Sequence, residues 1–245
     1  MGQDPKSPGA NTVKPNTAAV VRDRVAGSDA EYWRHSDFAD LPASAVAMTL
    51  SRLAREGVLR RVGKGVYYRP HRTSLGPSGP AASAVAAQTL RAPVHPAGLS
   101  AANVLGLSTQ NPRRAEYATP AAGPPTSLRG AVVHTRRPAA RAGLPVEDGA
   151  ILETLRERAR HSDLSPRRTI DRLLRVLSEE DRFGRLAAAA LEEPPRVRAI
   201  LGALGEELGM PESTLAPLRE SLNPLSRFDF GALGALRFAD RWQAK

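Results

Sequence analysis

The sequence predicts a mostly helical α+β protein: an N-terminal winged helix-turn-helix followed by a larger α+β domain with a helical C-terminal part. Three observations predict this class. Aromatic residues make up only 4% of the 245 residues, so the core must rely on Leu, Val and Ala, which suits helices. A helical pattern, a glycine and a basic hairpin follow one another near the N-terminus. After residue 146 a series of helical patterns begins, several with proline at the start.

Two domains are predicted, joined by a linker. Residues 1–15 are polar and contain Gly, Pro and Asn, a composition typical of a disordered arm. The winged helix-turn-helix is expected over residues 16–75. Three prolines and two glycines between residues 70 and 80 predict the linker. The second domain is expected over 81–245, with a basic α+β part at about 81–145 and a helical part at about 146–245.

Polar caps, glycine and proline set the element boundaries in the first domain. Asn16 or Thr17 can cap a helix over 17–26, which stops at Gly27. Pro42 then interrupts the chain. The remaining elements are a short helical turn over 36–41, a helix over 43–56 that stops at Gly57, and a hairpin over 58–69 that turns at 63–65.

Mixed α and β patterns are expected at the start of the second domain, and helices after them. An Ala-rich run predicts a helix over 81–90, and a second helix follows over 97–105. Short strands are expected over 116–119 and 131–135, separated by a loop over 120–130. The helical part is expected to contain helices over 147–160, 166–179, 182–192, 195–208, 212–220 and 231–242.

Basic residues concentrate in the first 145 positions. The chain has a net charge of +10 and a pI of about 10.8. Residues 1–79 hold 12 basic and 7 acidic residues, 80–145 hold 7 and 1, and 146–245 hold 16 and 17. Such a surface is typical of proteins that bind nucleic acid. Only 4 of the 35 cations are lysine, so a compositional bias toward Arg is the alternative explanation.

The helix over 43–56 combines an apolar face with an opposite face suited to the major groove. Val46, Leu50 and Leu53 recur at helical spacing and predict the buried face. The opposite face carries small residues and two arginines, and Arg binds guanine edges or phosphates. The hairpin behind it adds three cations that a wing can bring to the DNA backbone. We therefore expect double-stranded DNA to contact Ser44, Ala45, Met48, Ser51, Arg52, Arg55, Arg60, Arg61 and Lys64.

Two alternatives stay open for the basic residues of this helix and hairpin. A winged domain can serve for protein contact, and a helix can simply carry a solvated basic face. The basic segment of the second domain either extends the DNA footprint or forms a solvated loop surface. Its arginines are Arg113, Arg114, Arg129, Arg136, Arg137 and Arg141.

No constellation in the sequence predicts an enzyme, a metal site or a cofactor. The chain has no cysteine, and its five histidines lack metal-ligand spacing. The acidic pairs at 192–193 and 206–207 are interpreted as solvated helix faces. Glu153 and Glu157, with Arg156 and Arg160, have the spacing of surface ion pairs. No apolar run approaches the roughly 18 residues of a membrane span, and no signal peptide is evident, so we expect a cytoplasmic protein without a membrane partner.

Several segments resemble the AbiEi-type antitoxins of type IV toxin–antitoxin systems. The first block contains Leu-Ser-Arg-Leu at 50–53 and Gly-Val-Tyr-Tyr at 65–68, within the similar stretches 33–38, 45–61 and 65–70. A second block contains Leu-Gly-Leu-Ser-Thr-Gln at 105–110. Similar residues also occur at 99–104, 117–119 and 221–231, so that the resemblance covers about half the chain. The first 15 residues have no counterpart, and 120–145 is richer in Pro and Gly than the family pattern.

The resemblance implies an antitoxin that represses its own promoter and counters a nucleotidyltransferase-like toxin without a stable complex. Only the recognition helix, through 50–53, and the wing, through 65–67, can be carried over residue by residue. The second domain, 81–245, would supply the antitoxic activity. A different class remains as the alternative: a winged-helix DNA-binding protein whose second domain is an uncharacterised enzyme or effector.

Overall fold

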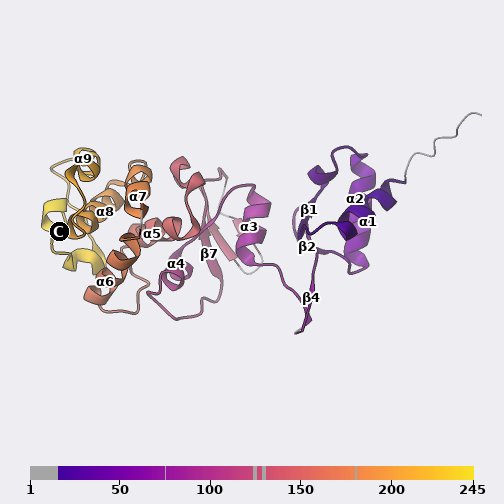
Figure 1. Ribbon diagram of the computed structural model, residues 1–245, viewed down its shortest axis with the longest axis horizontal. Coiled ribbons are helices and arrows are strands. Elements are labelled where there is room, and N and C mark those ends of the chain that lie inside the picture. Colours follow the sequence, from indigo (N-terminus) through magenta and orange to yellow (C-terminus); the bar gives the residue numbers. More distant parts are fainter. Residues whose placement is uncertain (1–15, 75, 124–125, 129–130, 180) are drawn as a thin grey trace, which may run out of the picture. The chain divides into compact units, whose positions relative to one another are not determined.

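The computed structural model confirms the predicted class, because the chain is α+β and mostly helical. It divides into two compact units, the first ending at Pro80 and the second beginning at Ala81 (Figure 1). The predicted arm over 1–15 lies outside the described residues. The structure describes residues 16–74, 76–123, 126–128, 131–179 and 181–245.

The first unit has the element order of a winged helix-turn-helix. Asn16 caps its first helix, accepting a hydrogen bond from the backbone N of Ala18 at 3.0 Å. Three strands form an antiparallel sheet in the order β1-β3-β2. The elements are α1 (Thr17–Gly27), β1 (Tyr32–Arg34), the 3-10 turn η1 (His35–Phe38), α2 (Ala43–Arg55), β2 (Arg60–Gly63) and β3 (Val66–Tyr68).

The core of this unit lies between its helices and its sheet. Val46, Leu50 and Leu53 of α2 are buried, which confirms the predicted inner face. They pack with the stacked pair Trp33 and Phe38, whose ring centroids lie 5.4 Å apart. This packing fixes which side of α2 stays exposed.

A second small hairpin follows the winged element, where the sequence predicted a linker. β4 (Arg72–Thr73) pairs antiparallel with β5 (Gly76–Pro77). The Ser78 side chain anchors it, because its hydroxyl lies 2.6 Å from the Tyr68 hydroxyl and accepts from the backbone N of His71 at 2.8 Å. The predicted linker over 70–80 is therefore partly wrong: two-residue strands among prolines leave too short a pattern to recognise.

The second unit joins a four-stranded sheet to a helical bundle. The sheet order is β6-β7-β9-β8, with β7 and β9 parallel and the other pairs antiparallel. β8 lies in the segment predicted as a loop, so that prediction is wrong in part. The sheet part contains α3 (Ala82–Leu90), β6 (His95–Pro96), α4 (Gly98–Val104), β7 (Ala115–Ala118), β8 (Thr126–Leu128), β9 (Ala131–His134) and the 3-10 turn η2 (Ala139–Gly143).

The helical bundle surrounds one buried helix. The residues from Asp148 to Leu155 are all buried, so this part of α5 is covered on every side, whereas Val146 and Glu147 at its start are exposed. It contacts α4 and β6 as well as α7 and α8, and thereby links the sheet to the bundle (Figure 1). The helices are α5 (Val146–Arg156), α6 (Pro166–Leu177), α7 (Arg182–Ala190), α8 (Pro195–Glu207) and α9 (Glu212–Glu220).

The C-terminal segment does not form the helix predicted over 231–242. Two 3-10 turns occupy it, η3 (Gly231–Ala235) and η4 (Asp240–Trp242), with Leu236 extended after the first. Trp242 is fully buried and lies against Gly202, where a Cβ would be 2.2 Å from the indole ring. Burying this large ring in the bundle requires an irregular path, which local helix propensity does not reveal.

Candidate nucleic-acid interface

The exposed side of α2 carries most of the residues predicted to contact DNA. Met48 is 73% exposed and lies near the middle of this side. Ser44, Ser51, Arg52 and Arg55 are also exposed. Ala45 is half-buried, and its carbonyl accepts a hydrogen bond from Thr49 at 2.8 Å, so it lies at the border of the face. The face therefore has a small, apolar N-terminal half and a cationic C-terminal half.

A groove of about 660 Å³ follows this face beside the N-terminus of α1. Met48, Arg52 and Arg55 line it from α2. Asn16 and Thr17 line it from α1, where the first amide groups of that helix also lie. The groove is thus open, polar on two sides and apolar near Met48.

The hairpin of β2 and β3 forms the wing. Arg60, Arg61 and Lys64 are all exposed, as predicted. Gly65 at the turn has φ of +68°, a left-handed conformation that favours glycine. The wing therefore presents its cations on the same unit as the α2 face.

A second hollow, of about 750 Å³, separates the C-terminal half of α2 from the wing. Its rim contains Arg55, Arg60 and Arg61. The Ser51 and Tyr67 hydroxyls, 3.3 Å apart, connect α2 to β3 along its wall. Ser51 and Arg55 line both this hollow and the groove beside α1, so α2 forms a ridge between two depressions.

The cations of this surface are largely free of acidic partners. Glu56 is the one acid near them in the sequence, and Arg22 binds both of its carboxylate oxygens at 2.9 Å. Arg52 lies farther away, with its Nε 3.9 Å from Glu56. Among the described residues, Arg55 and Arg60 form no ion pair with a carboxylate. The positive charge is thus available to an external polyanion.

The basic segment of the second unit does not form one surface. Arg113, Arg114 and Arg136 are exposed, and Arg114 donates to the carbonyl of Ala131 at 3.2 Å. Arg129 lies outside the described residues. The assignment of Arg137 to an exposed basic surface is wrong, because it donates to both carboxylate oxygens of Glu153, at 2.8 and 3.0 Å.

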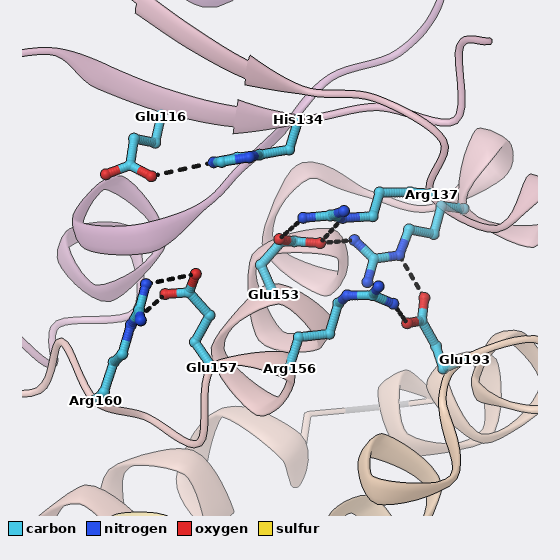
Figure 2. Close-up of polar contacts among 9 residues, drawn as sticks. Glu116, His134, Arg137, Glu153, Arg156, Glu157, Arg160 and Glu193 are labelled. Carbon is cyan, nitrogen blue, oxygen red and sulfur yellow. Dashed lines mark hydrogen bonds and ion pairs between the residues drawn. The ribbon is translucent and has the colours of Figure 1, made fainter. Parts of the chain in front are cut away.

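Arg137 belongs instead to a buried Arg–Glu network, the set Arg137, Arg141, Arg156, Glu153 and Glu193 (Figure 2). Arg141 is 0% exposed and connects the two carboxylates, with its Nε donating to Glu193 at 2.6 Å. Arg156 approaches Glu193 at 2.5 Å. Both alternatives for Arg141, a DNA contact and a solvated loop surface, are therefore wrong, as are the predictions of a solvated Glu193 and a surface Glu153. Glu157 and Arg160 do form the predicted ion pair at 3.0 Å.

The network holds Glu153 in the charged form. Burial alone would raise the pKa of Glu153, but hydrogen bonds and charges from Arg137 and Arg141 outweigh it and bring the pKa below its ordinary value. Next to the network, burial lowers the pKa of His95, whose Nε2 lies 3.0 Å from the Arg141 carbonyl. These groups join η2 to α5 and to the residues before α8.

No group of three or more His, Asp or Glu side chains suited to a metal ion occurs within the described part of the chain. No helix in that part is both long enough and apolar enough to cross a bilayer.

Comparisons with known proteins give similarity to a family without an assigned role. The profile of a family of unknown function, DUF6088, matches residues 33–129, from β1 through the first part of the second unit. No curated protein matches the chain. Among solved structures, the crystal structure of the RV2827C protein from Mycobacterium tuberculosis is similar, with 19% identity, a TM-score of 0.49, and coverage of 92% of this chain and 89% of that one.

Proposed function

We propose that the first unit binds double-stranded DNA through α2 and the wing. The observation that carries this proposal is the exposed α2 ridge, with Met48, Arg52 and Arg55 on it and an open depression on either side. A major groove about 12 Å wide admits one helix, and the two depressions leave room for the DNA walls. The wing cations lie beside the second depression.

Affinity comes mainly from phosphates in this proposal, and selectivity comes from bases. Arg55, Arg60 and Lys64 lack carboxylate partners among the described residues and are suited to phosphate contacts. Arg52 and Met48 face outward from the middle of α2 and are suited to base edges. Each good bidentate base contact discriminates by about 1–3 kcal/mol.

The role that fits such a surface is transcriptional repression of the protein's own promoter. Bound protein would exclude the polymerase sterically. Together with the resemblance to AbiEi-type antitoxins, this leads us to propose an antitoxin that acts in the cytoplasm against a nucleotidyltransferase-like toxin. The second unit would supply the antitoxic activity, without a stable complex between the two proteins.

Removal of both α2 arginines tests the DNA proposal. For Arg52→Ala plus Arg55→Ala we expect at least about tenfold weaker binding to the DNA upstream of the gene, because a base contact and a phosphate contact are both lost, and a salt slope shallower by about one, because only Arg55 is assigned to a phosphate. Electrophoretic mobility shifts at several salt concentrations measure both quantities.

The matched control is Arg227→Ala plus Arg237→Ala, which removes the same charge from exposed positions in the second unit. It should leave affinity and slope nearly unchanged. Unchanged binding and slope in the α2 variant would show that α2 is not the recognition helix.

Co-expression tests the antitoxin proposal. The product of the adjacent gene should arrest growth, and the full chain should relieve that arrest. The Arg52→Ala plus Arg55→Ala variant, expressed from a foreign promoter, should still rescue, because repression and antitoxicity reside in different units in this proposal. A full chain that gives no rescue contradicts the antitoxin role and leaves DNA binding untouched.

A further inference from the structure

A row of three arginines follows one side of α6 in the second unit. Arg168, Arg172 and Arg175 are spaced by four and three residues, so they recur on the same helix face. The row extends over about 10 Å, given a rise of about 1.5 Å per residue. All three line a single polar hollow of about 520 Å³, together with Gly106, Leu164 and Asp171.

These guanidinium groups lack the acidic partners that their neighbours have. Arg167, the adjacent residue, pairs with Asp171 at 3.2 Å and with Glu207 at 3.5 Å. Within the described residues, none of the three arginines of the row pairs with a carboxylate. Asp171 is the one acid among the lining residues, and Arg167 already engages it. The hollow therefore keeps an excess of positive charge in a region whose overall charge is balanced.

The central arginine is held in place before any ligand arrives. Its Nε donates to the carbonyl of Leu105 at 2.7 Å. Its guanidinium lies over Gly106, where φ is +67° and a Cβ would be 3.1 Å from Nη2. Arg172 is half-buried as a result, with one edge of its planar fork fixed. Preorganisation of this kind reduces the entropy that binding must overcome.

We infer that the α6 row binds the phosphate groups of a nucleotide ligand. Guanidinium forks match phosphate oxygens bidentately, and such hydrogen bonds are stronger than neutral ones. Several cations in a line suit a ligand whose charges also repeat, with about one charge per 3.4 Å along a nucleic-acid strand. These phosphate groups belong either to a polynucleotide backbone or to a free nucleoside polyphosphate. The α6 row belongs to the second unit and includes no residue of α2.

Binding by the full chain tests the inference with two probes. Sodium tripolyphosphate is titrated calorimetrically, and a short labelled oligouridylate, which forms no duplex, is followed by fluorescence anisotropy. The test variant is Arg168→Gln plus Arg175→Gln, which leaves Arg172 and its contact with Leu105 in place. The control is Arg227→Gln plus Arg237→Gln, with the same charge loss. Both pairs are also placed in the Arg52→Ala plus Arg55→Ala chain, which separates this site from the proposed DNA surface.

We expect the Arg168→Gln plus Arg175→Gln pair to weaken the affinity for the probe about tenfold or more in either background. The control pair should change that affinity less than about twofold, because charge-assisted contacts are lost only in the α6 pair. Loss confined to oligouridylate identifies a backbone, and loss confined to tripolyphosphate identifies a free nucleotide. The inference would be overturned if both variant pairs weakened binding equally, or if the unmodified chain bound neither probe at low salt. It would also be overturned if polyglutamate displaced a bound probe as effectively as the unlabelled probe does. Circular dichroism melting confirms that each variant is folded.

Discussion

The missing side chain at Gly149 lets the ring of His95 lie directly against α5. A Cβ at this position would be 2.1 Å from two ring atoms. His95 is 1% exposed and its Nε2 lies 3.0 Å from the carbonyl of Arg141, so the ring has little freedom to move away. The absence of a Cβ at Gly149 thus allows the close approach of β6 to α5.

We expect Gly149→Ala to lower the free energy of unfolding by about 1–3 kcal/mol, the usual range for overpacking. Chemical denaturation measures the change. Gly184→Ala is the matched control, because Gly184 is also inside a helix and a Cβ added there would meet no atom within 4 Å. It should raise stability by about 0.5–1 kcal/mol through helix propensity. The opposite order of the two variants would contradict this account of the contact.

Met48 provides a residue-level test of base readout within the proposed DNA function. Its exposed thioether side chain can contact the methyl group of thymine. One such methyl contact is worth about 0.8 kcal/mol, or about fourfold in affinity. Met48→Ala should therefore remove a preference of that size for thymine-containing over uracil-containing promoter DNA. Equal binding of both DNAs by the unmodified chain would exclude this contact, even if the protein binds DNA.

At the scale of elements, the buried Arg–Glu network connects η2, α5 and the turn before α8. Glu153→Gln leaves Arg137 without its charged acceptor and leaves the buried Arg141 with Glu193 as its one carboxylate partner among the described residues. We expect a loss of about 3–5 kcal/mol, typical of breaking a buried pair. Arg160→Gln, which removes an exposed ion pair with Glu157, should cost no more than about 1 kcal/mol. Similar costs for both variants in denaturant titrations would show that burial of the network adds nothing.

The sequence was sufficient for most elements and for the α2 face, because both depend on local patterns. Val46, Leu50 and Leu53 are buried as their spacing predicts. The buried network was missed because its partners are distant in sequence: Arg141 lies 52 residues from Glu193, and charge counting cannot detect such a pair. The C-terminal turns were missed for a similar reason, since the packing of Trp242 against Gly202 overrides local propensity.

At the scale of the whole molecule, stability should fall as the pH falls, in two steps. Burial lowers the pKa of His95 from its ordinary 6.5, so the neutral ring stabilises the fold above that pH and the contribution is lost below it. The pKa of Glu153 is lowered from 4.5, against the effect of burial, so its contribution is lost only at more acidic pH. Arg141, Glu153 and Asp148 are the charged groups that act on His95.

His95→Gln isolates the first step, because it removes the titrating group and keeps a hydrogen-bond donor. The free energy of unfolding of this variant should be nearly constant between about pH 7 and pH 5, whereas that of the unmodified chain declines. Urea titrations across this range measure both. A decline of equal slope in the variant would assign the first step to other groups.

The burial of α5 from Asp148 to Leu155 also sets a kinetic property of the second unit. Helices, strands and the Arg–Glu network pack around this buried part of α5, so solvent deuterons cannot reach its peptide groups through small fluctuations of a surface loop. Isotope uptake along this helix consequently reports the rare opening of the entire bundle. The exchange rate of these α5 amides therefore reports how often the second unit unfolds. A ligand that binds the folded second unit should slow this exchange, and the degree of slowing measures its binding.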